Sequence, residues 1–352
     1  MSTETRAGWT IGPFGTRWRR RTAIATLVSI LLLLAMWWLT MTTGALAISP
    51  GRVIVTLTGG GTRIENLVII DRRLSRLLAG SLIGFCLGTS GALTQTITRN
   101  PIATPDILGV SAGAGTFAVL ALVRPETTER LLGVSTTVAL VPVAILGGLI
   151  TTGVILTLGW RGGFDGYRLV LVGLGINALA LALTSWLLTR AEVEEASVAV
   201  RWLVGSLGGV RMGDVVYLAP MVALAVLICL RLAGGLGALR LGRDIGQALG
   251  VSAGRTEAGA HITAVALVSV ATAAAGPIAF VAFVAPQVAM RLFGTAGPPP
   301  LASGLVGALL LVGADFLAAR LPLELPVGIV TSVLGAPVLL YLMTRHLRRT
   351  SV

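Results

Sequence analysis

The sequence predicts an all-α integral membrane protein in which about ten transmembrane helices form one bundle. The first observation is composition: 55% of the 352 residues are hydrophobic and 12% are charged, against about 25% charged in a soluble domain. The second is the repetition of apolar runs about 20 residues long, the length that crosses a bilayer as a helix. The third is the 45 glycines, since small residues allow helices to pack closely in lipid. One lipid-embedded bundle accounts for all three observations.

Ten apolar segments are predicted to cross the membrane. They cover residues 23–43, 74–97, 107–123, 133–158, 169–189, 215–232, 258–275, 277–292, 301–319 and 327–343. A further apolar piece at 202–210 is too short to cross. Pro277 and Pro286 predict that the eighth segment is broken, which is tolerated where the irregular part is packed in protein or lines a cavity.

Ten crossings place both termini on one side of the membrane. That side holds sixteen of the 27 arginines and the other side holds eleven, which agrees with the excess of basic residues in cytoplasmic segments. We therefore expect a multi-pass protein of the cell membrane with a cytoplasmic N-terminal segment (1–22) and a cytoplasmic tail (346–352). The transmembrane domain covers 23–345, and its longest loop (233–255) is also expected in the cytoplasm.

The residue types exclude several kinds of chemistry. The chain has no lysine, so it lacks the residue that a P-loop places on nucleotide phosphates, and Schiff-base catalysis is excluded with it. Cys86 and Cys229 lie in separate apolar runs and His261 and His346 are far apart in sequence, so we expect neither a disulfide nor a metal site. The arginines are scattered singly, unlike a nucleic-acid surface. We expect no enzymatic activity, no cofactor and no nucleic-acid partner, and any energy source must lie on another polypeptide.

Two segments between the predicted helices carry distinctive turn signals. In 98–115, two prolines stop one helix and start the next, and Asp106 can cap the new N-terminus. This segment is either a rigid turn or a turn that closes the inner end of a pathway. In 233–255, a short helix is predicted that ends at Gly250. Because the chain contains no motor, we interpret this helix as a docking element for a partner.

Four stretches and one short motif occur in the order and spacing of a known family. The stretches are RNPIATPDILGVSAGAG, LGRDIGQALGV, GPIAFVAFVAPQVAMRLFG and ELPVGIVTSVLGAPVLLYLM, and the motif is Arg73-Leu74-Ser75-Arg76. With them the chain resembles the FecCD-type permeases, which are membrane subunits of binding-protein-dependent ABC importers for ferric siderophores, cobalamin and haem. The resemblance implies a type II ABC importer permease with ten helices and a short cytoplasmic coupling helix. It also implies four kinds of partner: a second permease subunit, identical or different, two cytoplasmic ATP-binding subunits, an extracytoplasmic substrate-binding protein and the transported substrate.

The resemblance also implies roles for individual residues on the cytoplasmic side. Asn100 and Ile102 fall where family members narrow the inner gate. Asp244, Leu249 and Gly250 fall in the segment that matches the coupling helix on the ATPase.

On the outer side, Arg73, Arg76 and Arg320 are the residues that the resemblance assigns to docking of the binding protein, through pairing with its acidic residues. Two positions depart from the family pattern: Ser75 replaces a usual proline, and Gln287 stands where a histidine is common after the proline.

The function that follows is translocation of a ferric siderophore by alternating access, driven by a partner ATPase. Cobalamin or haem are alternative substrates, because permeases for all three share these motifs. An ion-coupled secondary transporter is an alternative of a different class; it would use membrane-embedded carboxylates or histidines as relays, and only Asp315 and His261 are available. For Asp315 we favour a structural role, with a bond to neighbouring backbone or to Arg320. An intramembrane enzyme is disfavoured because no catalytic constellation is found.

Overall fold

The computed structural model of the chain describes residues 8–11, 14–17, 20–44, 46–159, 166–321 and 325–350. From Arg20 onward these residues form helices and short connections, and a small antiparallel hairpin of strands β1 (Gly8–Ile11) and β2 (Phe14–Arg17) precedes them. Seven described helices are long and apolar enough to cross a membrane, and three shorter apolar helices accompany them. The prediction of about ten helices in one bundle is confirmed.

The ten apolar helices correspond one for one to the predicted spans. They are α1 (Arg20–Thr42), α4 (Ser75–Thr98), α5 (Val110–Val123), α7 (Thr136–Gly159), α8 (Gly166–Thr189), α10 (Met212–Leu239), α12 (Ala253–Ala275), α13 (Val281–Phe293), α14 (Pro300–Ala318) and α15 (Val327–Thr350). Shorter elements connect them: α2 (Pro50–Leu57), α3 (Arg63–Asn66), the π-helix η1 (Leu67–Leu74), the 3-10 helix η2 (Pro105–Leu108), α6 (Pro125–Leu132), α9 (Val193–Leu203) and α11 (Arg243–Ala248).

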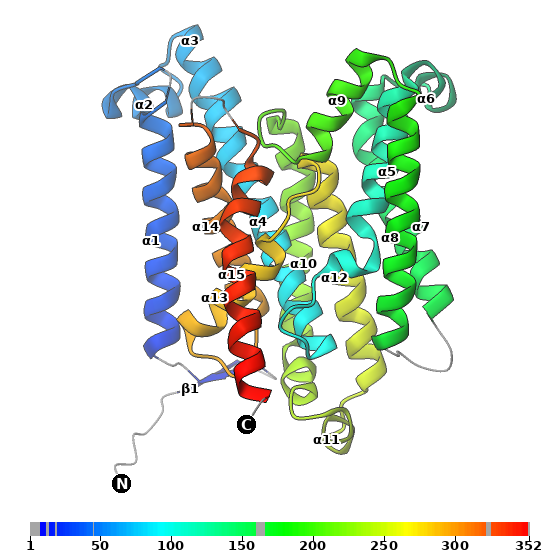
Figure 1. The fold of residues 1–352 in the computed structure, drawn as a ribbon. Helices are drawn as coiled ribbons and strands as arrows, with labels where there is room; N and C mark the ends of the chain where they lie inside the picture. The colour runs from blue at the N-terminus through cyan, green and yellow to red at the C-terminus, as the bar shows by residue number, and fades with distance from the viewer. Residues whose placement is uncertain are drawn as a thin grey trace.

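The long helices run side by side, so the bundle has two ends (Figure 1). One end carries β1, α11 and the last turn of α15, and we call it the terminal face. The other end carries α2, α3, α6 and α9, and we call it the opposite face. Both ends of the described chain therefore lie at the terminal face, as an even number of crossings requires.

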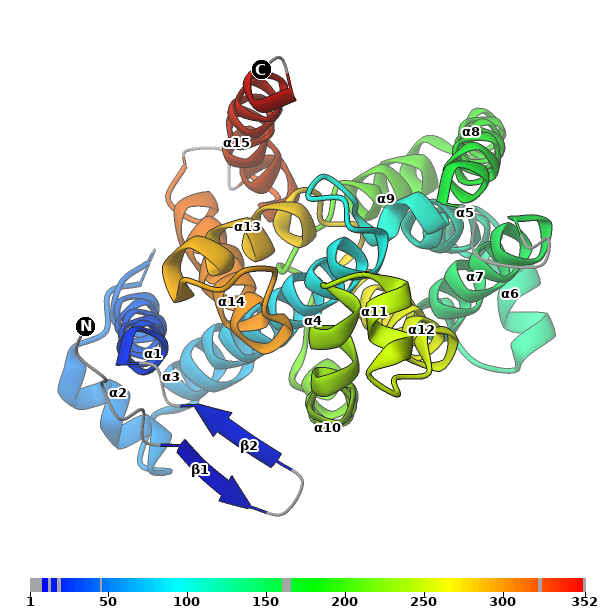
Figure 2. The ribbon, with the colours of Figure 1, turned by 90° about the horizontal axis from the view of Figure 1, so that it is seen from below.

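Helix α4 lies at the centre of the bundle, with α10, α12, α13 and α14 packed around it (Figure 2). Its contact with α14 is made backbone to backbone. A Cβ atom at Gly84 would lie 2.4 Å from the carbonyl oxygen of Gly307, and one at Gly88 would lie 2.1 Å from that of Ser303. Glycines on both helices permit this approach, which is how helices associate in lipid without a hydrophobic driving force.

Two helices extend beyond their predicted bounds. Helix α10 continues to Leu239 rather than ending near 232, so the loop predicted at 233–255 is reduced to the residues around α11. Helix α15 runs to Thr350, through most of the tail predicted at 346–352. An apolar run marks only the part of a helix inside the hydrocarbon, and both helices project beyond it. The N-terminal segment (1–22) and the tail are described only in part, because 1–7, 12–13, 18–19 and 351–352 lie outside the described residues.

Helices α5 and α13 are too short to cross alone. Their 14 and 13 residues span about 21 and 20 Å at 1.5 Å per residue, against about 30 Å of hydrocarbon. Irregular backbone supplies the remaining depth, at 99–109 before α5 and at 276–280 before α13. Backbone of this kind is tolerated at membrane depth only where it is buried in protein or lines a cavity. These two segments therefore mark the part of the bundle that ordinary helix packing does not explain.

Candidate gate and coupling site

The turn at residues 99–109, which we call the α4–α5 turn, contains both residues predicted at the inner gate. Helix α4 ends where Arg99 adopts a left-handed backbone (φ 51°), and α5 begins after Gly109, which is also left-handed (φ 70°). The side-chain oxygen of Asn100 accepts a hydrogen bond from the N–H of Ile102 at 3.0 Å. Asn100 and Ile102 are exposed, and 41% of Ile102 is accessible.

The α4–α5 turn is held by side chains from other helices. Three of its carbonyls accept hydrogen bonds, from Gln287 of α13 to Pro101 (3.3 Å), from Asn177 of α8 to Asp106 (3.2 Å) and from Thr152 of α7 to Leu108 (3.1 Å). In addition, Arg99 donates to the carbonyl of Leu239 at the end of α10 (3.1 Å). Carbonyls removed from water need such partners. The turn is thus irregular in backbone and is held by single side-chain hydrogen bonds to four helices.

Helix α13 begins at a strained residue. Phe280, directly before the helix, has a φ of 66°, and within the described residues Phe280 and Arg99 are the non-glycine residues with positive φ. A left-handed backbone at such residues costs about 1–3 kcal/mol, and it persists where the surroundings impose it, often at functional sites. Arg99 begins the irregular segment at 99–109, and Phe280 ends the irregular segment at 276–280.

The predicted break in the eighth span lies at 276–280 and not at Pro286, which sits inside α13. Pro286 has no N–H, so the carbonyl of Ala282 loses its usual helical donor. Gly91 of α4 lies against that carbonyl, since a Cβ atom at Gly91 would be 1.7 Å from the Ala282 oxygen. A proline is accommodated inside a transmembrane helix where a neighbouring helix packs closely. Of the two prolines that predicted a broken eighth span, Pro277 therefore lies in the break and Pro286 does not.

Two cavities border the α4–α5 turn. The first, of about 410 Å³, is lined by Asn100 of the turn, Arg243 of α11 and Glu257 of α12. The guanidinium of Arg243 lies 3.7 Å from the carboxylate of Glu257. The second cavity, of about 480 Å³, is lined by Asp106 of the turn, by the break before α13 and by Ser332 of α15. The α4–α5 turn therefore borders α11 through the first cavity and the broken span through the second.

The short helix predicted to end at Gly250 is present as α11, which ends at Ala248, and Gly250 has a φ of 81°. The three predicted coupling residues, Asp244, Leu249 and Gly250, are exposed, and a Cβ atom at Gly250 would meet nothing within 4 Å. Leu241, Ile245 and Leu249 are 63%, 50% and 63% accessible. Ile245 and Leu249 are four residues apart in α11 and at its C-cap, so they lie on one side of the helix. Leu241 precedes Gly242, whose φ of 131° lies outside the helix, and the three side chains together form an exposed apolar patch on the terminal face.

At the opposite face, Arg76 is paired with Asp315 of α14. The Nε and Nη2 atoms of Arg76 donate to the two carboxylate oxygens at 2.7 Å each. The carboxylate is nearly buried, and the Arg76 side chain is 32% accessible. Asp315 thus has a paired, structural position, but its partner is Arg76 rather than the predicted Arg320.

The other two predicted docking residues also make contacts within the chain. Arg73 donates hydrogen bonds to the carbonyls of Met41 and Leu46. Arg320 donates to the hydroxyl of Thr43. All three arginines lie near the opposite face, and their guanidinium groups are already oriented by the chain.

Ser75, where the family commonly has proline, lies directly after the π-helix η1 in a helix that continues from Arg63 to Thr98. Its hydroxyl donates to the carbonyl of Ile70 at 3.2 Å. The π-helical segment carries Arg73, and such segments occur frequently at functional sites.

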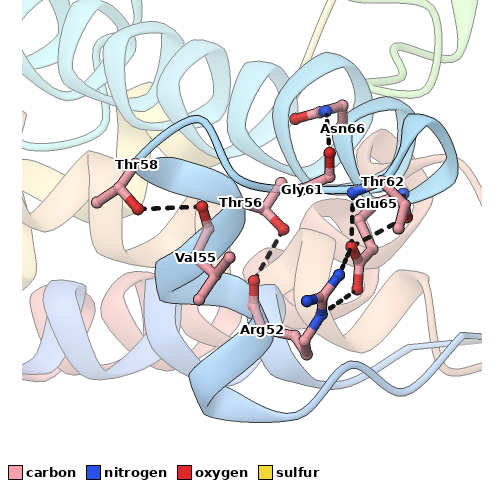
Figure 3. A network of polar contacts seen from close by, with 8 residues as sticks. All are labelled: Arg52, Val55, Thr56, Thr58, Gly61, Thr62, Glu65 and Asn66. Carbon is pink, nitrogen blue, oxygen red and sulfur yellow. Dashed lines mark hydrogen bonds and ion pairs between the residues drawn. The ribbon is translucent and has the colours of Figure 1, made fainter.

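The connection between α2 and α3 is closed by a polar network (Figure 3). Thr62 and Glu65 form a capping box at the start of α3, in which each satisfies a backbone N–H of the other. Arg52 of α2 donates to both carboxylate oxygens of Glu65, from Nε at 2.6 Å, and the hydrogen bond and charge of Glu65 raise the pKa of Arg52. The Asn66 side chain donates to the carbonyl of Gly61 at 3.0 Å. This network orients the chain where it enters the long central helix.

The predicted site residues thus form two groups, one around the α4–α5 turn and α11, and one at the opposite face. Reasoning from sequence missed the residues that hold the turn, among them Thr152, Asn177 and Gln287. Gln287 carried a signal, because it departs from the family pattern. Asn177 carried none, since a single amide in an apolar run has many possible partners.

Comparisons with known proteins agree with the helical architecture of the chain. Residues 30–345 match the FecCD transport family. The ferric enterobactin transport system permease protein FepG of Escherichia coli (strain K12) is 37% identical over 325 residues, covering 92% of this chain and 96% of that protein. The iron-uptake system permease protein FeuC of Bacillus subtilis (strain 168) is 31% identical, covering 90% and 96%. A solved structure described as an inward-facing conformation of a metal-chelate type ABC transporter has a TM-score of 0.78 and 25% identity, covering 92% of this chain and 99% of that chain.

Proposed function

The chain belongs to the FecCD transport family, and from this premise we propose that it is the ABC importer permease subunit that carries a ferric siderophore into the cytoplasm. The observation that carries the substrate assignment is the set of similar permeases, of which FepG is named for ferric enterobactin and FeuC for iron uptake. A chelate passes through the membrane chemically unchanged, so the chain has only to bind the chelate, release it on the other side and exclude other solutes. Cobalamin and haem remain the alternative substrates.

The α4–α5 turn is proposed as the inner gate, narrowed by Asn100 and Ile102. The support is local: the backbone is irregular, it is bordered by strained residues, and cavities adjoin it. A segment held by single side-chain bonds can change position at low cost, because one such bond is worth about 1 kcal/mol net. Alternating access then needs only a rearrangement of this turn and the broken span beside it.

The energy for this rearrangement is proposed to come from two cytoplasmic ATP-binding subunits that contact α11. Leu241, Ile245 and Leu249 are exposed apolar side chains on the terminal face, the kind of surface that a partner groove covers. Gly250 offers no side chain, so partner backbone can approach closely there. Arg243 and the first cavity connect this contact with Asn100 of the turn.

A second permease subunit and an extracytoplasmic binding protein complete the proposed importer. Arg73, Arg76 and Arg320 are proposed as the docking residues for the binding protein. Charges of this kind set the orientation and association rate of a complex more than its affinity, and orientation by contacts within the chain, as seen here, favours that role.

This assembly requires the terminal face to be cytoplasmic, as the arginine distribution predicts. Single cysteines at Arg243 and Arg63, in a cysteine-free background, test it with an impermeant thiol reagent. We expect position 63 to be labelled in intact cells and position 243 only in inverted vesicles. Labelling of position 243 in intact cells would exclude the orientation.

The substrate assignment is tested by uptake in a strain that lacks this gene. Radiolabelled ferric siderophores, cobalamin and haem are supplied in parallel, and the strain is complemented with the wild-type chain. Of the three substrates, we expect only a ferric siderophore to lose its uptake in the deletion strain and to regain it in the complemented strain. Loss of cobalamin or haem uptake instead would change the substrate assignment to that compound and leave the permease role unchanged.

A further inference from the structure

Two buried glutamines form a polar pair between α4 and α13. Gln287 donates from Nε2 to the Oε1 of Gln95 at 2.7 Å, and Gln95 donates from Nε2 to the carbonyl of Phe283 at 3.2 Å. Each residue is only 3% accessible. The pair joins residues 192 positions apart in the chain. In an apolar interior, two amides are retained only if each finds partners.

The same Nε2 atom of Gln287 also lies 3.3 Å from the carbonyl of Pro101, in the α4–α5 turn. Gln287 therefore contacts three elements: its own helix α13, Gln95 of α4 and the turn. The other side chains that bond to carbonyls of the turn come from α7 and α8, which are complete spans. Gln287, by contrast, is a side chain of the short helix α13, which begins directly after the strained Phe280.

We propose that Gln287, oriented by Gln95, is a positioning residue that joins the α4–α5 turn to α13, so that the inner gate and the broken span move together. This inference rests on the proposed gate at Asn100 and Ile102. A glutamine suits the task because its amide nitrogen has two donors, one for Gln95 and one for Pro101. The departure from the family pattern at Gln287 thus has a physical role, since a histidine nitrogen offers a single N–H.

The test follows the accessibility of Ile102 rather than transport alone. Ile102→Cys is introduced with Cys86 and Cys229 replaced by alanine, and the complete transporter is placed in nanodiscs. The labelling rate with an impermeant maleimide is measured without nucleotide and with a non-hydrolysable ATP analogue. The larger of the two rates divided by the smaller gives a ratio, which reports how strongly the accessibility of residue 102 depends on the nucleotide state of the ATPase. In Gln287→Met we expect that ratio to fall by roughly fivefold, the equivalent of one net buried hydrogen bond.

Further variants separate positioning from general destabilisation. Gln95→Met should give an intermediate ratio, because Gln287 keeps its Pro101 acceptor but loses its orienting partner. Gln287→His should keep most of the ratio through its N–H donor. Thr184→Val is the matched control, since it removes a buried side-chain contact between α8 and α5, the 3.0 Å bond to Thr116, and the hydrogen bonds of both hydroxyls go to α5 and α8 rather than to the turn. Its ratio should equal that of the unsubstituted chain.

An unchanged ratio in Gln287→Met would overturn the proposal, and so would an equal loss in Thr184→Val. If Gln287→Met does not yield folded protein, the other two variants decide the test. The proposal predicts a lower labelling ratio in Gln95→Met than in Gln287→His, and equal ratios in the two variants would overturn it. A ratio of one in the Ile102→Cys background without any further substitution would show instead that residue 102 is not at the gate. That result would contradict the proposed gate rather than the role of the glutamine pair.

Discussion

The central helix α4 is held in two different ways at its two ends. Toward the opposite face Arg76 of α4 pairs with Asp315. Along the middle of the helix Gly84 and Gly88 meet α14, and Gly91 meets α13, with backbone against backbone. Toward the terminal face the helix is held by the amide of Gln95, which bonds to α13, and by side chains that bond to carbonyls of the adjoining turn. Backbone contacts at van der Waals distance cannot shift without a clash, whereas single hydrogen bonds exchange with little net change in free energy.

This difference explains why the gate is proposed at one end of α4 and not at the other. A transporter needs a part that stays fixed while another part rearranges, and packed interfaces behave as discrete states rather than deforming smoothly. The glycine contact supplies the fixed part. The α4–α5 turn, with the cavities beside it, supplies the part that can change.

The largest effect is expected from a side chain placed in the glycine contact. Gly88→Leu should destabilise the bundle by about 3 kcal/mol or more, because a Cβ atom there already lies 2.1 Å from the carbonyl of Ser303 and overpacking of a backbone contact cannot relax. The thermal unfolding midpoint of the solubilised protein measures it. Gly153→Leu is the control, since a Cβ atom at Gly153 meets nothing within 4 Å. Equal midpoints for the two variants would contradict the fixed end.

A smaller loss of stability is expected at the ion pair. Asp315→Leu should cost about 2 kcal/mol, less than the 3–5 kcal/mol of a fully buried pair, because Arg76 is 32% accessible. The double variant with Arg76→Met should be more stable than Asp315→Leu alone, since it leaves no unpaired charge. A double-mutant cycle of unfolding free energies checks this coupling. Additive losses would show that the pair does not stabilise the fold.

No loss of stability is expected at the coupling helix, where the effect is on function. Gly250→Trp projects into open space on the terminal face, so the bundle should fold and insert normally. The variant should lose transport and the stimulation of ATPase activity by the loaded binding protein. ATPase rates in nanodiscs, with and without that protein, measure the effect, and Gly153→Leu serves again as the matched control. Stimulation at the level of the unsubstituted complex would place the coupling contact elsewhere, most plainly at the Asn100 turn.

The smallest effect is expected at the docking arginines. Charge reversal at Arg76 would place a second carboxylate beside that of Asp315, so the structure favours a milder test with Arg73→Gln and Arg320→Gln together. Docking of the binding protein should weaken a few-fold at low salt, with the difference shrinking as screening shortens to about 8 Å at physiological ionic strength. Binding measurements over a salt series would detect it. A salt-independent affinity, equal to that of the unsubstituted chain, would remove these residues from the interface.

The spans could be predicted from sequence because an apolar run of bilayer length has one dominant solution, a crossing helix. Helix α11 was predictable for a local reason too, since Gly250 ends it. The continuation of α10 to Leu239 was not predicted, because three glycines interrupt residues 233–239 and glycine is a weak helix former. The hairpin before Arg20 and the π-helix η1 were not predicted either.

The site was predictable only in part, for a related reason. Asn100 and Ile102 lie in a motif with strong turn signals, so their segment stood out. The partners of the turn come from helices distant in sequence, and the proline in α13 suggested a break that Gly91 of α4 makes unnecessary. Asp315 likewise has Arg76 as its partner rather than the sequence neighbour Arg320. Tertiary packing decides such pairings, and local patterns do not contain it.

The most direct test of the account is the energy source of transport. The complete transporter is reconstituted in proteoliposomes with ATP in the lumen, and binding protein loaded with a radiolabelled ferric siderophore is supplied outside. We predict uptake that requires lumenal ATP, persists when a protonophore collapses the proton gradient, and is lost in Gly250→Trp. Uptake without ATP that follows an imposed proton or sodium gradient would contradict the account and identify the chain as an ion-coupled transporter.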